Sequence, residues 1–126
     1  MMVTARKATI LAAGVFAFSV WSTSYAQNAE RGRKVFEECI ACHALKPTHE
    51  DIGPSLLGVL GRKAGSSEGF RYSNALRRSN LVWNQESLEK FLSDPQAFLP
   101  GNRMPYAGLV ATEDRAAVIQ YLETLK

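Results

Sequence analysis

The chain has 126 residues, of which 46% are hydrophobic and 21% charged, and its formal net charge is +3. This length suits one globular domain and is too short for two well-packed ones. A net charge this small gives no support for nucleic-acid binding, which requires a clustered basic face.

The first 26 residues have the composition of a secretory signal peptide. Arg6 and Lys7 form a short basic region, residues 8–20 are almost continuously apolar, and Ser24-Tyr25-Ala26 resembles a small-x-small cleavage site. The alternative is an uncleaved anchor helix, but the apolar run is shorter than the roughly 20 residues that a membrane span needs. We therefore predict a signal peptide over residues 1–26 and export of the remainder.

Residues 27–126 form the one expected domain. The leader carries two cations and no anions, so its removal lowers the formal net charge from +3 to +1. The only dense basic stretches of the domain, Arg62-Lys63 and residues 71–78, fit solvent-exposed loop charges as well as they fit a partner surface.

The first expected helix delivers a pair of cysteines. Asn28 can cap a helix that begins near Ala29, in which Val35, Phe36 and Cys39 recur at three- and four-residue spacing.

A long loop follows this helix. Residues 46–69 contain two prolines and five glycines, too many breakers for a long regular element. We expect an ordered loop with one helical turn over residues 56–60.

The second half of the domain predicts further short helices. Residues 73–78 can form one or two helical turns, and Asn84 can cap a firmer helix that Asp94-Pro95 ends. After a Pro- and Gly-rich segment at residues 99–105, Thr112 can cap a last helix, whose first turn holds acidic residues that favour a helix N-terminus.

The expected fold is all-α, with three to five short helices and long loops, because no stretch alternates with the period of two that marks a sheet. A domain of about 100 residues whose middle is loop buries little surface between helices and is marginally stable on its own. A large apolar cofactor would supply the missing core.

Cys39, Cys42 and His43 form the Cys-x-x-Cys-His pattern by which c-type haem is attached. Two thiols three positions apart at a helix end can each bond to one vinyl group of the porphyrin, and the adjacent imidazole then lies beneath the iron. We therefore predict one haem c, bound covalently through Cys39 and Cys42, with His43 as an axial ligand of the iron.

Other uses of the two cysteines fit less well. A disulfide between them would close a minimal loop and add little stability. A redox pair like that of thioredoxin belongs between a strand and a helix, a context that is absent here. A zinc site needs four ligands, and only the distant His49 could complete Cys39, Cys42 and His43.

Met104 is the expected second axial ligand, because it is the only methionine beyond the leader. A thioether is a soft, weak donor that suits haem iron and raises its reduction potential. A lone methionine is often core filler, and His49 is the alternative ligand. His49 lies only six residues beyond His43 in a polar loop, where we expect it to be exposed to solvent.

Taken in order, these motifs resemble class I cytochrome c, the small monohaem type of bacterial periplasms and mitochondria, over residues 28–126. Gly32 and Phe36 match the positions where the first helix of that family crosses the last, at residues matched by Val118 and Tyr121. The resemblance implies the cytochrome c fold, wrapped around one haem.

The resemblance also implies roles around the haem. The carbonyl of Pro54 would accept a hydrogen bond from His43. Arg62 would lie near a propionate, Tyr72 and Trp83 would donate hydrogen bonds to the propionates, and Asn102 would lie in the ligand loop.

Two positions depart from the family pattern inside the pocket. Phe91 replaces a tyrosine that hydrogen-bonds the ligand methionine in mitochondrial members, and Leu76 replaces an asparagine. Both changes remove polar groups, so we expect a drier pocket with an altered potential. Tyr106 replaces a phenylalanine near the exposed haem edge.

The lysine ring around that edge in mitochondrial members is largely missing. Its positions are filled by Glu38, Gln96, Val110 and Ala111, and the cations left are Arg103 and the nearby Lys46 and Arg33. We expect a small, transient partner contact with an apolar centre and without strong electrostatic steering.

The resemblance implies a periplasmic one-electron carrier that is not an enzyme and acts as a monomer. Donors and acceptors of the right kind are a quinol-oxidising cytochrome complex, a terminal oxidase, a photosynthetic reaction centre and a periplasmic dehydrogenase. The alternative is a haem enzyme or ligand sensor with a labile Met104 bond, but the sequence offers no distal acid-base pair for it.

Overall fold

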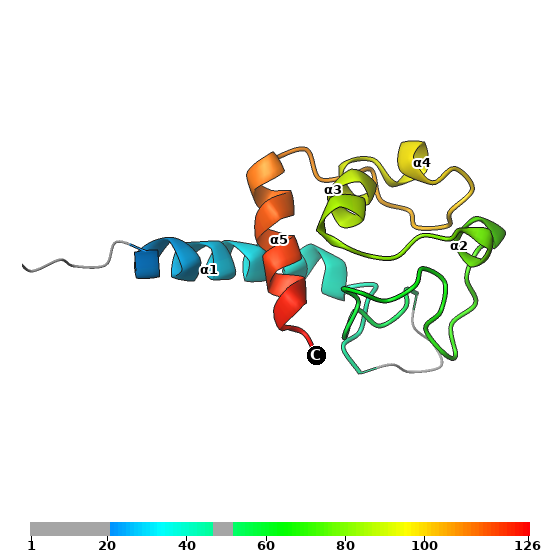
Figure 1. Cartoon of the computed structure of the whole chain (residues 1–126), viewed down its shortest axis with the longest axis horizontal. Helices are drawn as coiled ribbons and strands as arrows, with labels where there is room; N and C mark the ends of the chain where they lie inside the picture. Colours follow the sequence, from blue (N-terminus) through cyan, green and yellow to red (C-terminus); the bar gives the residue numbers. More distant parts are fainter. Residues whose placement is uncertain (1–20, 47–51) are drawn as a thin grey trace, which may run out of the picture.

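The computed structural model describes residues 21–46 and 52–126, the first six of them by their backbone only. The described part is helical and holds no strand, only an isolated antiparallel bridge between Lys63 and Val82. None of its helices is both long enough and apolar enough to cross a membrane. The helices, shown in Figure 1, are α1 (Trp21–Ile40), α2 (Asn74–Arg78), α3 (Gln85–Ser93), α4 (Pro95–Phe98) and α5 (Thr112–Thr124).

Helices α1 and α5 cross each other in the most extensive helix contact of the described residues (Figure 1). A Cβ atom on Gly32 would lie 2.2 Å from the carbonyl oxygen of Ala117, so only glycine allows this approach. The rings of Phe36 and Tyr121 pack with centroids 5.1 Å apart. The predicted helix crossing is therefore confirmed, and it fixes the end of α1 that precedes the cysteines.

Side-chain caps place the middle helices. Ser73 accepts a hydrogen bond from the backbone of α2, and Asn84 forms a capping box with Ser87 at the start of α3. Asp94 ends α3 and caps α4, whose first residue is Pro95. The sequence predicted the stop at Asp94-Pro95 but not α4, because proline ends one helix and also suits the first turn of the next.

Three predicted details are wrong. Helix α1 begins at Trp21, so Asn28 lies inside it and does not cap it; residues 21–28 contain no proline or glycine to stop the helix. Helix α5 has Ala111 at its N-cap, since the hydroxyl of Thr112 accepts a hydrogen bond from Arg115 instead. Residues 56–60 form a hydrogen-bonded turn and not a helix.

Candidate functional site

A cavity of about 420 Å³ lies between the helices and the loop that follows α1. This volume is within the range of sites that hold cofactors and small ligands. Its lining includes apolar residues of the core itself, namely Val59, Trp83, Leu88, Phe91, Leu92, Val118 and Leu122. The fold therefore surrounds a space where a protein of this size would otherwise place side chains.

One wall of the cavity is built from the last turn of α1 and the residues that follow it. Cys39, Cys42 and His43 all line the cavity, and the backbone N–H groups of Cys42 and His43 both bond to the carbonyl of Cys39, at 3.1 and 2.9 Å. Both cysteines are free. The predicted attachment residues are thus gathered at one side of one cavity.

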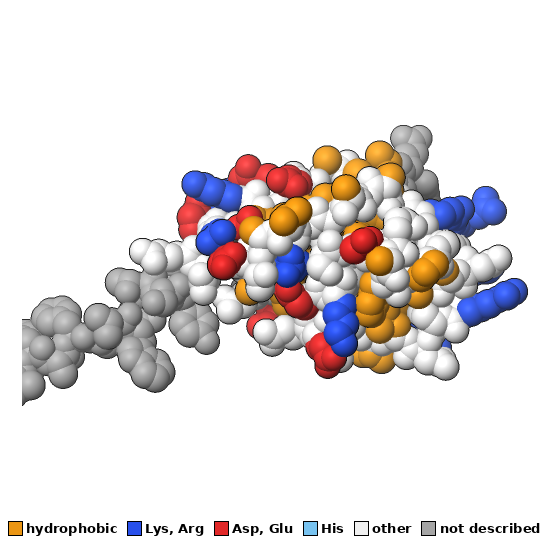
Figure 2. Space-filling view, turned by 90° about the horizontal axis from the view of Figure 1, so that it is seen from above, with side chains coloured by type: hydrophobic (Ala, Val, Ile, Leu, Met, Phe, Trp, Pro, Cys, Tyr) orange, Lys and Arg blue, Asp and Glu red, His pale blue; other side chains and the backbone are white. Residues whose placement is uncertain are grey.

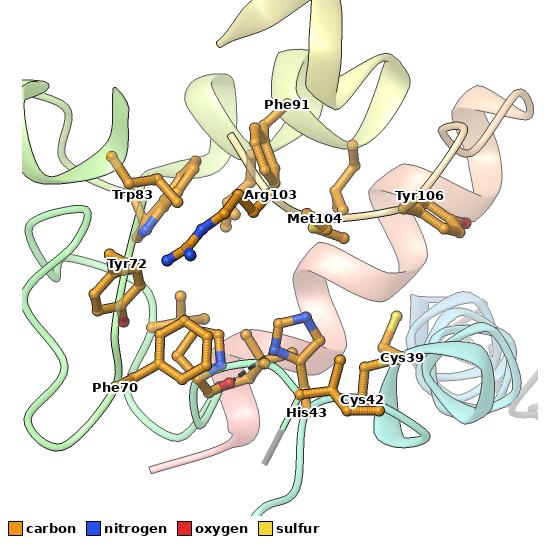
Figure 3. Close-up of a pocket in the computed structure, with 18 of the residues that line it drawn as sticks. Cys39, Cys42, His43, Phe70, Tyr72, Trp83, Phe91, Arg103, Met104 and Tyr106 are labelled. Carbon is orange, nitrogen blue, oxygen red and sulfur yellow. Dashed lines mark hydrogen bonds between the residues drawn. The ribbon is translucent and has the colours of Figure 1, made fainter. Parts of the chain in front are cut away.

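The ring of His43 is held from behind. Its Nδ1 lies 2.7 Å from the carbonyl oxygen of Pro54, and since a carbonyl only accepts, Nδ1 carries the proton. A Cβ atom on Gly53 would lie 2.7 Å from both Cε1 and Nδ1 of the ring, so Gly53 makes room for it. These contacts leave Nε2 as a lone-pair donor facing the cavity (Figure 3).

Burial shifts the pKa values of Cys39 and His43 in the directions that favour their neutral forms. Desolvation lowers the pKa of His43, although its bond to Pro54 acts in the opposite direction. Desolvation raises the pKa of Cys39 to about 11, with smaller contributions from Glu38 and Cys42. A neutral imidazole is the form that binds a metal ion.

Met104 occupies the opposite wall (Figure 3), in the loop after α4. This loop is held by Asn102, whose side-chain nitrogen donates to the carbonyls of Pro95 and Leu99, at 2.7 and 2.9 Å. The side-chain oxygen of Asn102 accepts from the N–H of Met104 at 2.9 Å. Asn102 is 6% exposed and does not line the cavity, so it positions Met104 from behind the loop.

The end of the cavity away from the cysteines is polar. Tyr72, Trp83 and Arg103 lie at this end (Figure 3), and Arg62 and Arg71 also line the cavity. The guanidinium of Arg62 is fixed by the carbonyls of Ser55 and Leu57, at 2.8 and 3.0 Å, and that of Arg103 donates to the carbonyl of Arg71.

This lining fits haem c. Two free thiols stand beside an imidazole and a thioether that face each other, the middle is apolar, and the far end offers cationic and N–H or O–H donors suited to two propionates. No arrangement of three or more His, Cys, Asp or Glu residues in the described ranges could hold a metal ion by itself.

Sequence reasoning missed two side chains of this site. Arg103 was expected only among the cations around the haem edge; it is exposed, and it also lines the cavity. Gln96 was expected at that edge too, but its amide donates to the carbonyl of Met104 and to Asn102, both at 3.2 Å. Gln96 lies in α4, a helix that the sequence did not predict, so its contact with the Met104 loop could not be predicted either. His49 lies outside the described residues.

The two pocket departures lie where the resemblance implied. Phe91 and Leu76 both line the cavity, and Phe91 packs on Trp83 with ring centroids 5.0 Å apart. Near the cysteines, the hydroxyl of Tyr106 donates to the carboxylate of Glu38 at 3.4 Å. Burial, and then the charge of Glu38, raises the pKa of Tyr106.

Comparisons with known proteins agree with the geometry. The family model for cytochrome c matches residues 29–126. The chain is 47% identical to "Cytochrome c2 iso-2" of Magnetospirillum molischianum over 91 residues, which are 72% of this chain and 94% of that protein. It is 43% identical to "Cytochrome c2" of Rhodomicrobium vannielii over 108 residues, 83% and 86% of the two chains.

A solved structure, cytochrome cH from Methylobacterium extorquens, has the same fold. It superposes with a TM-score of 0.72 at 38% identity, over 76% of this chain and 97% of the other. The predicted fold class and covalent haem c are confirmed. The chain belongs to the cytochrome c family of haem-binding electron carriers.

Proposed function

We propose that the protein is a one-electron carrier of the bacterial periplasm in which His43 and Met104 bind the haem iron from opposite sides. The observation that carries this proposal is the pair of facing walls, with the imidazole on one and the thioether on the other (Figure 3). When bound, haem c supplies a reversible change between ferric and ferrous iron.

The residues of the chain would keep that change free of large rearrangements. Pro54 holds the imidazole through Nδ1, and Asn102 holds the backbone of Met104. The apolar side chains between the two walls exclude water, which raises the cost of the extra charge on the ferric form and so raises the potential. A haem iron held by both His43 and Met104 would have no open site for a substrate.

The periplasmic assignment rests on residues 1–26, which we propose to be a cleaved signal peptide ahead of the domain at residues 27–126. Cleavage after Ala26 would keep Gly32 and Phe36, which pack on α5, in the mature chain. Mass spectrometry of the purified, exported protein should give a chain that begins at Gln27. A chain that retains Met1 would contradict the cleavage.

The partners fit the same assignment. A quinol-oxidising cytochrome complex or a periplasmic dehydrogenase would supply electrons to the monomeric carrier. A terminal oxidase or a photosynthetic reaction centre would accept them. Each encounter would be brief, as a diffusing carrier must release one partner to reach the next.

The ligand assignment is tested by absorption spectroscopy of the holoprotein. We expect a sulfur-to-iron charge-transfer band at the red end of the ferric spectrum, lost in Met104→Ala and kept in His49→Ala. The reduced wild-type protein should not bind carbon monoxide, whereas reduced Met104→Ala should. A wild-type protein that lacks the band and binds carbon monoxide would instead favour a haem enzyme or sensor.

A further inference from the structure

Tyr106 is tied to Met104 through the backbone. The N–H of Tyr106 donates to the carbonyl of Met104 at 2.9 Å, which closes a three-residue turn around Pro105. The ring of Pro105 fixes one of the two backbone dihedral angles at the centre of that turn. Because the turn is short and stiff, a contact that holds Tyr106 in place also holds the backbone of Met104.

The supports of the Met104 loop described so far do not involve α1. Asn102 and Gln96 fasten the beginning of the loop to α4. Beyond Tyr106, the N–H of Leu109 donates to a carbonyl of α3 at 2.7 Å. Residues 105–107 lie between these two attachments and are held by neither.

The side chain of Tyr106 supplies a third attachment, which does reach α1. Its hydroxyl donates to the carboxylate of Glu38 at 3.4 Å, across 68 positions of the sequence. Glu38 lies in the last turn of α1, directly before Cys39, and all three side chains line the cavity. Figure 3 shows Tyr106 at the same end of the cavity as Cys39. Among the hydrogen bonds of the described residues, this one alone joins residues 99–111 to α1.

The surroundings of Tyr106 keep its hydroxyl a donor. Burial, and then the charge of Glu38, raises the pKa of Tyr106, so the hydroxyl keeps its proton at neutral pH. A carboxylate accepts hydrogen bonds and binds a hydroxyl more strongly than a neutral acceptor does. The length of 3.4 Å limits the strength of this bond, so we expect effects of several-fold and not of orders of magnitude.

Both partners of the bond depart from the family pattern. Tyr106 stands at a position of phenylalanine, and Glu38 stands at a position of the lysine ring. Phenylalanine has no donor and lysine has no acceptor, so the family pattern cannot form this hydrogen bond. The two departures together create it, which makes the contact a property of this chain.

We propose that Tyr106 and Glu38 are positioning residues whose hydrogen bond ties the Met104 loop to α1 and keeps Met104 directed at His43 across the cavity. This inference rests on the proposed function, in which Met104 is an axial ligand. The bond connects a loop held largely by side chains to a helix that is packed against α5 at Gly32. Its loss should let the loop open more often while the fold stays intact.

The first test measures how readily imidazole displaces Met104 from the ferric holoprotein. Imidazole can bind only while the loop is open, so its apparent affinity rises with the open fraction. Tyr106→Phe keeps the ring and removes only the donor. This variant should bind imidazole about three- to tenfold more tightly than the wild type.

Tyr121→Phe is the matched control for this measurement. It removes a hydroxyl from a ring that packs on Phe36 at the helix crossing and does not line the cavity. It should change the affinity for imidazole by less than about twofold. Equal affinities of the wild type and Tyr106→Phe, or equal gains in the two variants, would overturn the proposal.

A double-mutant cycle tests whether the two side chains act through each other. Glu38→Ala should tighten imidazole binding about as much as Tyr106→Phe, and the double variant should gain less than about twofold over either single change. Glu37→Ala is the control, because Glu37 pairs with Arg33 on the surface of the same helix and does not line the cavity. It should leave the affinity within about twofold. Gains that multiply in the double variant would overturn the proposal.

Amide hydrogen exchange of the holoprotein follows the loop independently of the iron ligands. In Tyr106→Phe the N–H groups of residues 104 and 106, which bond to Asn102 and to the carbonyl of Met104, should exchange about three- to tenfold faster than in the wild type. The N–H of Leu109 is the internal control, since it is fastened to α3, and should change by less than about twofold. Equal acceleration at all three groups would indicate a general loss of stability and would overturn the proposal.

The sulfur-to-iron band of the wild type keeps the two proposals apart. If the band is absent, the assignment of Met104 as a ligand fails, and the exchange rates still decide whether the bond ties the loop to α1. If the band is present and Tyr106→Phe exchanges like the wild type, the ligand assignment stands and the role of Tyr106 and Glu38 is refuted.

Discussion

The two walls that face each other across the cavity are built by different means. The His43 wall follows directly from α1, which is locked to α5 at Gly32, and its imidazole meets a backbone carbonyl. The Met104 wall is a loop without helix or strand, held by the side chains of Asn102 and Gln96. Arg115 fastens the end of this loop by donating to the carbonyls of Leu109 and Val110, at 2.6 and 2.8 Å.

This difference indicates which wall yields first. A loop that depends largely on side-chain hydrogen bonds can open locally at a lower free energy than a pair of packed helices. We therefore expect the Met104 side to open while the His43 side keeps its place.

Removing the side-chain amide of Asn102 should release the loop that holds Met104. Asn102→Ala loses four side-chain hydrogen bonds in a buried position and leaves the N–H of Met104 without its acceptor, a cost of about 2–4 kcal/mol. We expect a weakened sulfur-to-iron band and binding of carbon monoxide in the reduced state. Gln96→Ala removes only the outer bonds and should lower stability by about 1 kcal/mol. Equal effects of the two changes would contradict this ranking.

A substitution at Gly53 tests how firmly the ring of His43 is held. A methyl group there would meet the imidazole at 2.7 Å, so Gly53→Ala should cost about 1–3 kcal/mol and displace the ring. NMR signals of the ferric haem methyl groups would report the displacement. Gly58→Ala is the control, since Gly58 has φ +60° and nothing within 4 Å of an added Cβ atom. It should lower stability without moving those signals, and the same displacement in both variants would argue against this role for Gly53.

A hydroxyl group placed between the walls tests how dry the pocket is. Phe91→Tyr adds a hydroxyl group to the apolar pocket, so the midpoint potential should shift by about 20–50 mV, or roughly 0.5–1 kcal/mol for one electron. Potentiometric titration measures the shift. An unchanged potential would count against a dry pocket.

The smallest effect is expected at a surface pair that belongs to neither wall. A hydrogen bond from Lys90 lowers the pKa of Glu86 in the folded state. The Glu86 carboxylate is therefore harder to protonate in the folded state than in the unfolded chain. The pair stabilises the fold at a pH above the pKa that Glu86 has in the unfolded chain, and this stabilisation fades as the pH falls through the lower pKa of the folded state. Because both side chains are exposed, Glu86→Gln should change the melting temperature only slightly at pH 7 and not at pH 3. A clear loss at pH 3 would show that Glu86 acts through more than its charge.

Much of the site could be predicted from local sequence. The Cys-x-x-Cys-His spacing lies at one helix end, and the cap at Asn84 and the helix stop at Asp94-Pro95 depend on residues only a few positions away. Gly32, His43 and Pro54 were placed because their roles come with the family pattern, and the helix crossing and the bond to Pro54 are present in the structure.

The tertiary structure alone decided the support of the Met104 loop and its contact with α1. Gln96 reaches Met104 only because α4 exists, and Arg103 turns into the cavity because the carbonyl of Arg71, far away in the sequence, accepts its hydrogen bond. Glu38 and Tyr106 are 68 positions apart in the sequence. They meet because both line the same end of the cavity, and a contact between distant segments leaves no local signal in the residues that make it.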